Sequence, residues 1–409
     1  MMTVEKVHLF DTIAKGGIMT AAKHDSTVSM AMLMGNMGKG GVEAVAMNYL
    51  RHLASKDIRI DVLLHENNPF PQRRELEALN IPFYTIPSYS KPFAYHKALL
   101  NLFRHRQYTI VHAHVSTMNL FPLLAAWRAG VPVRICHNHS TAHWGEGVKT
   151  LLKYILRLPA RLFATDYFAC GEYSGRWMYG DRLVDAGRVF VLPSAIDGSA
   201  YAFHEEARNN IRHVLGLEES CFVVGHVGRF VYQKNHDFLL DIFAAIKRRR
   251  PKSVLLLIGE GPLQIRLEEK ARSLRISDAV KFVGTRDDMG AWYSAMDVLI
   301  LPSFYEGMPM VAVEAQANGL GCLFSSNITT EALLAENAVM LPLKQDPDAW
   351  ATEAFAGSRQ VANLPAAFAI ETQAESLYAA YRHFSRRALG PQWDIAIIQP
   401  EMPVRDGAV

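Results

Sequence analysis

Short apolar runs rich in β-branched residues alternate along the chain with longer segments whose apolar residues recur at helical spacing, and this alternation occurs twice. Such a pattern is typical of βαβ units around a parallel sheet, whose strands are buried on both faces. The first series predicts strands at Thr27–Met34, Arg59–Leu64, Phe83–Ile86, Ile110–His114, Val133–Cys136, Tyr167–Cys170 and Val189–Leu192. The second predicts strands at Phe222–Val227, Ser253–Ile258, Val280–Val283, Val298–Leu301, Gly321–Phe324 and Ala338–Leu341. We therefore expect two α/β domains with parallel sheets.

The segment 193–204 gathers Pro, Gly and Ser residues between the two series and is the predicted hinge. The predicted domains are then 27–192 and 205–370, facing each other across a cleft. Residues 371–388 have a helical pattern, and residues 1–26 and 389–409 are interpreted as tails. Because ligands bind beyond the carboxyl ends of parallel strands, the residues that follow each strand are the candidates for a site.

Composition narrows the class of protein. The 409 residues contain 43 Lys and Arg against 40 Asp and Glu, a balance that gives no reason to expect a nucleic-acid partner. The four cysteines have no CxxC spacing, which fits a reducing cytoplasm better than a zinc ribbon or a disulfide framework. No run approaches the roughly 18–20 apolar residues of a membrane span, and the first residues do not resemble a secretion signal. We expect a cytoplasmic protein that is not integral to a membrane.

A glycine-rich loop, GNMGKGGVEAV, follows the first strand and includes Gly40 and Gly41. Glycines at this position allow backbone amides to approach an anion at the start of the next helix. The spacing matches neither a Walker loop nor GxGxxG. A tight turn from strand to helix explains the glycines as well as an anion site does.

Histidines follow the fourth and fifth strands. A period of two places His112 and His114 on one face of the strand, at the end where ligands bind. A metal site with His137, His139 or His143 is conceivable. No carboxylate follows at metallohydrolase spacing, so no metal is expected.

In the second half, Arg229 and Lys234 lie on one loop between a strand and a helix. Two cations on such a loop can converge on a diphosphate, although a solvated loop would also accommodate them. Gly259 and Gly261 after the next strand lack the third glycine of a dinucleotide fingerprint, which disfavours an NAD enzyme.

The most informative stretch is LPSFYEGMPMVAVEAQANG, in which seven residues separate Glu306 from Glu314. Pro309 is suited to the first turn of a helix. The start of that helix would offer free backbone amides at Gly307 to Met310 for a phosphate. A carboxylate beside it could accept hydrogen bonds from sugar hydroxyls.

From Val28 to Arg387 the chain resembles the retaining glycosyltransferases of family four, which have the two-domain GT-B fold. The specific marks are the spaced pair of glutamates, the Gly-Arg and Lys-Asn pairs around Arg229 and Lys234, and the GKGGVEAV loop. The stretch YFACGEYSGRWMYG and the later NITTEA further resemble the exopolysaccharide and capsule branch of that family.

The resemblance implies two Rossmann-like doubly wound domains, with the last helix crossing back to the first domain. It also implies roles in donor binding. Arg229 and Lys234 would hold the donor diphosphate and neutralise its charge, so that no metal or other cofactor is needed. Glu306 would contact the donor sugar and Glu314 the ribose.

Further positions follow from the same resemblance. His114 would lie beside the reacting centre, with His137 as a weaker match. The sugar and phosphate would be held by backbone amides in the segment of Gly307, Met308, Pro309 and Met310. The nucleobase would lie near Gly261 and Thr285, and Gly40 and Gly41 would line the cleft floor.

Three departures from the family pattern stand out. Ser194 follows the hinge proline where relatives commonly have an asparagine, Gly321 stands where proline is common, and Gly171 stands where serine is usual. None of them touches the cations or the glutamate pair, so we expect activity to be retained.

The implied partners are a nucleotide-sugar donor, with uridine diphosphate favoured, and a saccharide or polyprenyl-diphosphate-linked acceptor. Two alternatives remain open. One is a nucleotide-sugar epimerase of GT-B fold, and the other is a GT-B protein that binds a nucleotide without catalysis.

A basic amphipathic helix is predicted at GVKTLLKYILRLPARLF, with Lys149, Lys153, Arg157 and Arg161 spaced four apart. Such a helix can lie on an anionic membrane, here the inner face where a lipid-linked acceptor resides. Alternatively, its apolar residues cover the first domain and its cations form a solvated stripe.

Overall fold

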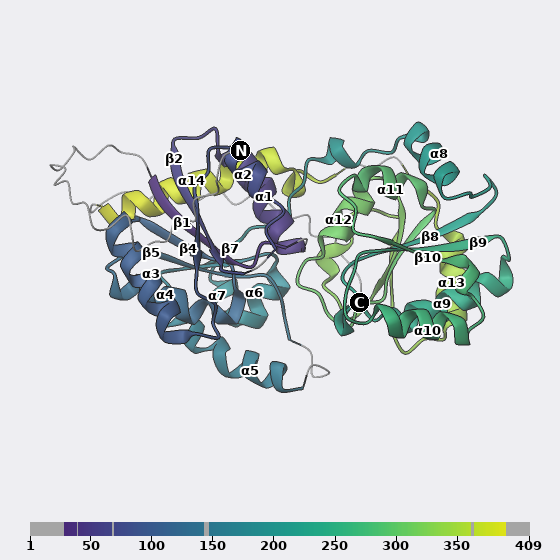
Figure 1. Ribbon diagram of the computed structural model, residues 1–409, viewed down its shortest axis with the longest axis horizontal. Coiled ribbons are helices and arrows are strands. Elements are labelled where there is room, and N and C mark those ends of the chain that lie inside the picture. Colours follow the sequence, from purple (N-terminus) through teal and green to yellow (C-terminus); the bar gives the residue numbers. More distant parts are fainter. Residues whose placement is uncertain (1–27, 39, 68, 143–146, 361–363, 390–409) are drawn as a thin grey trace, which may run out of the picture.

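The computed structural model describes residues 28–38, 40–67, 69–142, 147–360 and 364–389. Within them, the strands form a seven-stranded sheet of order β3-β2-β1-β4-β5-β6-β7 and a six-stranded sheet of order β10-β9-β8-β11-β12-β13. The paired strands run parallel in both sheets. In both, the chain winds outward from the first strand in one direction and then in the other, as in a doubly wound fold. Figure 1 shows the two sheets side by side, each covered by helices on both faces.

The predicted strands are all present, and their ends differ from the prediction by at most two residues; Thr27 lies outside the described residues. In the first sheet they are β1 (Val28–Gly35), β2 (Ile58–His65), β3 (Phe83–Ile86), β4 (Ile110–Ala113), β5 (Val133–Asn138), β6 (Asp166–Ala169) and β7 (Val189–Val191). In the second they are β8 (Phe222–Val227), β9 (Ser253–Ile258), β10 (Val280–Gly284), β11 (Val298–Leu301), β12 (Gly321–Ser325) and β13 (Ala338–Leu341).

The helices fill the connections between strands. They are α1 (Gly41–Leu53), α2 (Arg73–Ala78), α3 (Pro92–Arg106), α4 (Leu120–Arg128), α5 (Val148–Arg157), α6 (Glu172–Tyr179), α7 (Asp181–Asp185), α8 (Glu205–Val214), α9 (His236–Arg249), α10 (Gln264–Ser273), α11 (Met289–Ala295), α12 (Met310–Ala317), α13 (Pro347–Ala356) and α14 (Ile370–Leu389). The central strands β4, β8 and β11 are buried along their whole length. This burial explains why they appear in the sequence as nearly continuous apolar runs.

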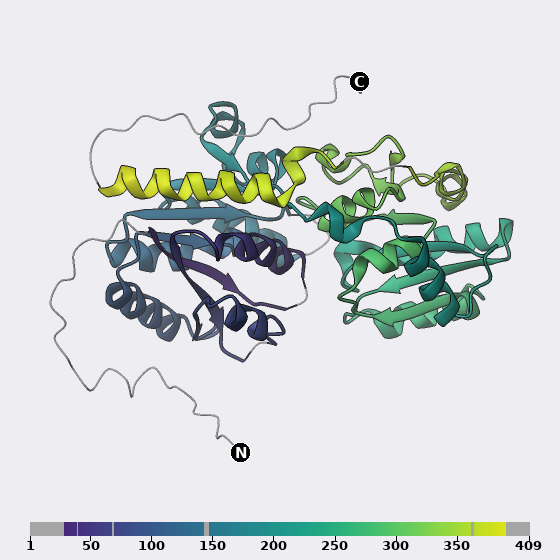
Figure 2. The same ribbon diagram turned by 90° about the horizontal axis from the view of Figure 1, so that it is seen from above.

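The chain passes between the two sheets twice. At the crossing, Ile196 N donates to Phe368 O at 2.9 Å and Ile370 N donates to Ile196 O at 3.0 Å, so the two connections form a short parallel bridge. Beyond it, α14 runs back along the first domain, as predicted, and is the long yellow helix of Figure 2. The Tyr381 hydroxyl reaches His112 of β4 at 2.7 Å, and Arg387 forms an ion pair with Asp166 at 2.7 Å.

In the described part of the chain, no helix combines the length and the apolar character that crossing a bilayer requires. The predicted tails, 1–26 and most of 389–409, lie outside the described residues, as does His143.

Candidate active site

An ion pair joins the two loops that the sequence singles out in the second domain. Lys234 ends a 3-10 turn after β8, Glu306 follows β11, and Lys234 Nζ lies 2.7 Å from Glu306 Oε1. Gln233 Nε2 donates to the other oxygen of Glu306 at 2.9 Å. Asn235 then adopts a left-handed conformation with φ 53°, which asparagine tolerates better than most residues, and α9 begins after it. This turn holds the lysine against the glutamate.

Glycines allow the loop after β8 to lie close to its neighbours. A Cβ atom on Gly228 would lie 2.9 Å from Lys234 Cε, so the lysine stem crosses directly over this residue. A Cβ atom on Gly261 would lie 2.6 Å from the Phe230 nitrogen. Gly259 N donates to Gly284 O at 2.9 Å, and Thr285 follows directly. The segments that follow β9 and β10, which carry Gly261 and Thr285, therefore lie together beside the loop that carries Arg229.

The entrance of α12 lies at the junction of the two domains. The helix begins at Met310, and Pro309 has an extended backbone as the preceding cap residue. The expectation that Pro309 lies in the first helical turn was therefore wrong by one residue, because the Pro309 backbone has ψ 115° and the helix begins after it. No side chain caps α12 in the structure as described, and Glu306 to Met310 are buried. The entrance thus leaves amide groups available for an anion.

Contacts across the domain junction fix this entrance. Gly307 packs against the carbonyl of His139, and a Cβ atom on Gly307 would lie 3.1 Å from Cys170 Sγ. Ser194 of the predicted hinge donates from Oγ to Met308 O at 3.3 Å. Ser194 thus contacts the Gly307 to Met310 segment directly.

Glu314 lies one turn into α12 and is held by two tyrosines. Tyr293 donates to Oε2 at 2.7 Å and Tyr201 donates to Oε1 at 3.2 Å. Burial raises the pKa of the Glu314 carboxyl, and the two tyrosine hydrogen bonds oppose this rise. Sequence reasoning missed both tyrosines, because nothing in the local pattern around Tyr201 or Tyr293 marks them.

The glycine loop of the first domain faces Arg229. Gly40 is the cap residue of α1 and Gly41 its first residue, and the carboxylate of Glu43 folds back over Gly40. Burial raises the pKa of Glu43, while its own backbone hydrogen bond and the positive charge of Arg229 lower it. The charge of Arg229 therefore acts across the domain junction. Sequence reasoning did not assign a role to Glu43, although the GGVEAV stretch contains it.

Four histidine rings form a stack at the carboxyl ends of β4 and β5. His112 and His114 share a face, as predicted, with ring centroids 4.1 Å apart, and His137 stacks on His139 at 3.9 Å. His112 Nε2 and His137 Nδ1 are hydrogen-bonded at 3.0 Å, and so are His114 Nδ1 and His139 Nε2. His139 is the histidine whose carbonyl touches Gly307, whereas His114 contacts His139.

The stack is also where a metal could bind. Ring nitrogens of His112, His114 and His137 lie within 4.8 Å of one another. Coordination by all three would require one hydrogen bond of His112 to open, because its Nδ1 is bonded to Tyr381 and its Nε2 to His137. The three rings are therefore close enough to hold a metal ion, although the sequence pattern provided no reason to expect one. The ring nitrogens of His112 are already used in hydrogen bonds, so the three ligands are not all free.

The histidine stack predicts acid sensitivity. Burial lowers the pKa of His112, His114 and His137 well below the usual value, and that of His139 to about 3. The unfolded chain therefore binds more protons below pH 6.5, and the stabilisation present above that pH is lost as the pH falls. Each such histidine contributes up to about 1.4 kcal/mol per pH unit. We expect the melting temperature to fall steeply between pH 6.5 and 5.

Scanning calorimetry at several pH values checks this expectation. His137→Gln should make the melting temperature less dependent on pH, whereas His105→Gln, on the exposed surface of α3, should not. A melting temperature that is constant from pH 7 to 5 would contradict the assignment of neutral buried histidines.

Gly171 has a physical explanation in a contact between the domains. Glu331, in the NITTEA stretch of the second domain, accepts hydrogen bonds from the backbone amides of Glu172 and Tyr173 at 2.7 and 2.8 Å. Its carboxylate thus caps α6 of the first domain, where a serine at position 171 would normally serve as the cap. A Cβ atom on Gly171 would lie 2.8 Å from Glu331 Oε2. The glycine makes room for a cap that the other domain supplies.

This cap predicts the behaviour of a double variant. Glu331→Ala should lower kcat/KM by about threefold to tenfold, because a charge-assisted cap at the surface stabilises the domain junction modestly. Gly171→Ser should be harmful beside Glu331. In the Glu331→Ala background it should restore thermal stability, since the introduced hydroxyl can then cap α6, but not kcat/KM. Steady-state rates and melting temperatures of the two single variants and the double variant test this expectation. If the double variant recovered both kcat/KM and thermal stability, the result would contradict a role for Glu331 in bridging the two domains.

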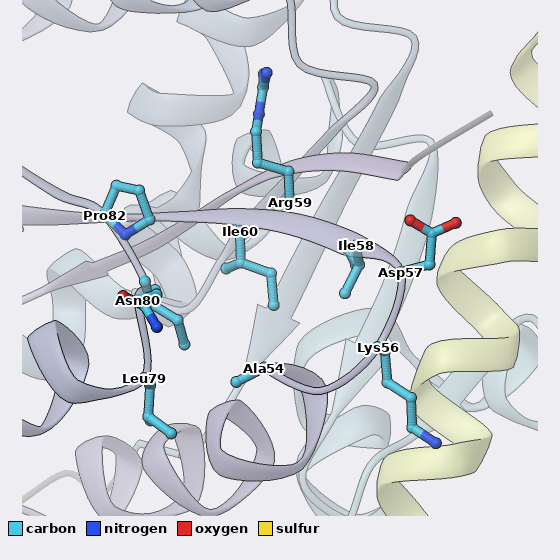
Figure 3. Close-up of a pocket in the computed structure, with 10 residues that line it drawn as sticks. Ala54, Lys56, Asp57, Ile58, Arg59, Ile60, Leu79, Asn80 and Pro82 are labelled. Carbon is cyan, nitrogen blue, oxygen red and sulfur yellow. The ribbon is translucent and has the colours of Figure 1, made fainter. Parts of the chain in front are cut away.

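A hollow of about 320 Å³ lies elsewhere, at the amino-terminal end of β2 (Figure 3). Lys56, Asp57 and Arg59 lie at its rim, and the Lys56 side chain points towards α14, where it pairs with Glu375. Ligands of parallel sheets bind at the opposite, carboxyl ends of the strands. We therefore do not assign the candidate site to this hollow.

Solved structures share this fold. The Anabaena protein Alr3699/HepE, crystallised with UDP and glucose, superposes with a TM-score of 0.71 at 18% identity, over 86% of this chain and 99% of that one. Two parallel-sheet domains whose last helix returns to the first domain are the GT-B fold.

Sequence comparison gives the family. Residues 39–199 match the model described as Glycosyltransferase Family 4, and residues 221–356 match Glycosyl transferases group 1. EpsF of Bacillus subtilis (strain 168), a protein named as a glycosyltransferase, is 34% identical over 358 residues, 86% of this chain and 93% of its own length. The chain belongs to glycosyltransferase family 4.

A second relative has a more specific name. The UDP-Gal:alpha-D-GlcNAc-diphosphoundecaprenol alpha-1,3-galactosyltransferase of Escherichia coli is 26% identical over 310 residues, which cover 73% of this chain and 79% of that protein.

Proposed function

We propose that this glycosyltransferase moves a hexose, with retention of anomeric configuration, from a UDP-sugar to a saccharide or a polyprenyl-diphosphate-linked saccharide. The product would be part of an exopolysaccharide, capsule or related glycan made at the cytoplasmic face of a membrane. The observation that carries the proposal is the largely buried Lys234–Glu306 pair beside the amide-rich entrance of α12. It supplies a cation for the leaving diphosphate and a carboxylate for the sugar within one site.

Arg229 and Lys234 act on the diphosphate in this proposal. Lys234 is a compact charge already held in place by Glu306, and Arg229 offers a planar fork on an exposed loop. The amides of Gly307, Met308 and Met310 add hydrogen bonds at the positive end of α12. Preorganised donors of this kind stabilise the charge that develops as the diphosphate departs. We therefore propose that transfer requires neither a metal nor another cofactor.

Glu314 binds the ribose hydroxyls in this proposal. Tyr201 and Tyr293 each donate to one of its oxygens, which orients the carboxylate and leaves its remaining lone pairs for the ribose. The nucleobase lies near Gly261 and Thr285, beside the loop after β8. Gly40 and Gly41 line the first-domain side of the site opposite Arg229.

The reaction proceeds on one face of the sugar. Glu306 is neutralised by Lys234 and Glu314 is bound by tyrosines, so neither is arranged as the attacking carboxylate of a retaining hydrolase. The leaving phosphate oxygen accepts the proton of the acceptor hydroxyl as the new bond forms. His139 contacts the Gly307 loop and His114 positions the His139 ring, so this pair lies beside the reacting centre.

The experiment is a panel of nucleotide sugars tested with lipid-linked and soluble acceptors and read by mass spectrometry. Transfer from a UDP-hexose, with an α-linked product by NMR when the donor is α-linked, supports the proposal. Free epimerised sugar formed without an acceptor would instead support a nucleotide-sugar epimerase. Nucleotide binding without any turnover would support a non-catalytic protein.

A further inference from the structure

The helix α5 turns its apolar face away from the protein. Val148, Leu151, Leu152, Ile155, Leu158 and Leu162, which we call the α5 stripe, are all at least half exposed, from 50% at Leu152 to 82% at Val148. They recur every three or four residues, so they lie along one side of α5 and of the short turn that follows it. Thr150, on the other side, is buried.

This orientation overturns one of the two interpretations of the sequence. The alternative in which apolar residues cover the first domain beneath a solvated basic stripe is wrong, because the apolar residues are outside. The cause lies in the contacts of the polar face. Lys153 lies 5.3 Å from the ring centroid of Tyr305, and Arg157 lies 5.8 Å from those of Tyr154 and Trp177. Arg161 donates to Tyr179 O at 2.6 Å.

The surface around the α5 stripe is rich in positive charge. Lys153, Arg157 and Arg161 lie along the protein side of α5 and are only partly buried, so their charges remain partly accessible beside the helix. Residues 78–165 include α3, α4 and α5 and contain ten Lys and Arg residues but a single acid, Glu146; the rest of the chain has 33 Lys and Arg against 39 Asp and Glu. Figure 1 shows these helices on the face of the first sheet opposite α1 and α14.

An aromatic side chain extends the same surface. Trp127, at the end of α4, is 53% exposed, and its ring lies 5.3 Å from that of Phe163, next to Leu162 of the stripe. Tryptophan is favoured where a surface passes from apolar to polar surroundings, as at a lipid headgroup. An apolar stripe bordered by cations and an interfacial tryptophan matches an anionic lipid surface in both polarity and charge.

We propose that the α5 stripe inserts into the interface of an anionic lipid bilayer, with the basic α3–α4 face against the headgroups. If the proposed function holds, this docking also orients the active site, because Lys153 contacts Tyr305, the neighbour of Glu306. Membrane binding itself does not depend on the transferase reaction.

The test is flotation of the full chain with vesicles of phosphatidylcholine, with and without 30% phosphatidylglycerol (roughly a third anionic lipid). The chain should float with the anionic vesicles, and binding should weaken at least about tenfold at high salt. Leu152→Glu with Ile155→Glu should weaken it by at least about tenfold, because two charges would enter the apolar layer. Val214→Glu with Ile265→Glu, which changes two apolar residues of the second domain that are even more exposed, should have no effect.

The outcomes separate the possible occupants of the stripe. Failure of the wild-type chain to float, equal binding to neutral vesicles, or undiminished flotation of the α5 variant would overturn the proposal. A wild-type dimer that the α5 variant converts to a monomer, with no vesicle binding by either, would assign the stripe to a second copy of the chain. Turnover of a water-soluble acceptor should be the same in both double variants. Turnover absent in all forms despite vesicle binding would reject the proposed function and leave this inference standing.

Discussion

Lys234→Ala should lower the rate of sugar transfer by about a hundredfold to a thousandfold, the effect of losing one preorganised charge-stabilising group, or about 3–4 kcal/mol. The substitution removes the cation that we propose acts on the departing diphosphate. It also leaves Glu306, which is 7% exposed, without its 2.7 Å partner and with Gln233 as its remaining donor. Initial rates of UDP release at saturating donor measure the effect.

Lys252→Ala is the matched control. Lys252 is an exposed lysine of the same domain that pairs with Glu218 at 2.6 Å, away from the domain junction. It should retain the wild-type rate. Unchanged melting temperatures for both variants would show that the loss in Lys234→Ala is chemical. A normal rate in Lys234→Ala would remove this residue from the mechanism.

Gly307→Ala should lower kcat/KM by at least about tenfold, because a misplaced loop of an active site commonly costs one to two orders of magnitude. The added methyl would meet the His139 carbonyl and Cys170 Sγ of the other domain. The Gly307 to Met310 amides must then move away from the first domain, which separates the two halves of the site. Steady-state kinetics with the donor identified by the nucleotide-sugar panel measure the effect.

Gly357→Ala provides a control for adding a methyl group. Gly357 ends α13 with φ −69°, which alanine adopts readily, and its added Cβ would contact Gly321 Cα at an ordinary 3.8 Å. We expect wild-type kinetics. If Gly307→Ala also behaved as wild type, the close contact between Gly307 and His139 would not be needed for activity.

The sheets could be predicted well because their strands are buried on both faces. Such strands leave continuous apolar runs, as in the VLIL of β11 and the SVLLLI of β9, and the alternating connections then favour parallel order. The loops after these strands could also be selected, since ligands of parallel sheets bind there. That selection included Lys234 and Glu306, which the structure brings into contact.

Partners that are distant in sequence could not be predicted. The hydrogen bonds of Glu314 with Tyr201 and Tyr293, and of Glu331 with the start of α6, join residues 21 to 159 positions apart. No local period reports such contacts. For α5, the period correctly defined two faces, but which face the protein covers depends on residues such as Trp177 and Tyr305 that pack against it.

The central claim is that Arg229 and Lys234 bind the diphosphate of the donor. Calorimetric titration of UDP and of uridine into the wild-type chain and into Arg229→Ala with Lys234→Ala tests it most directly. We expect the wild type to bind UDP at least about a hundredfold more tightly than uridine, since two charge-assisted contacts are each worth about 1.5–3 kcal/mol, and the double variant to lose most of this difference. An equal preference for UDP in the two proteins would contradict the claim.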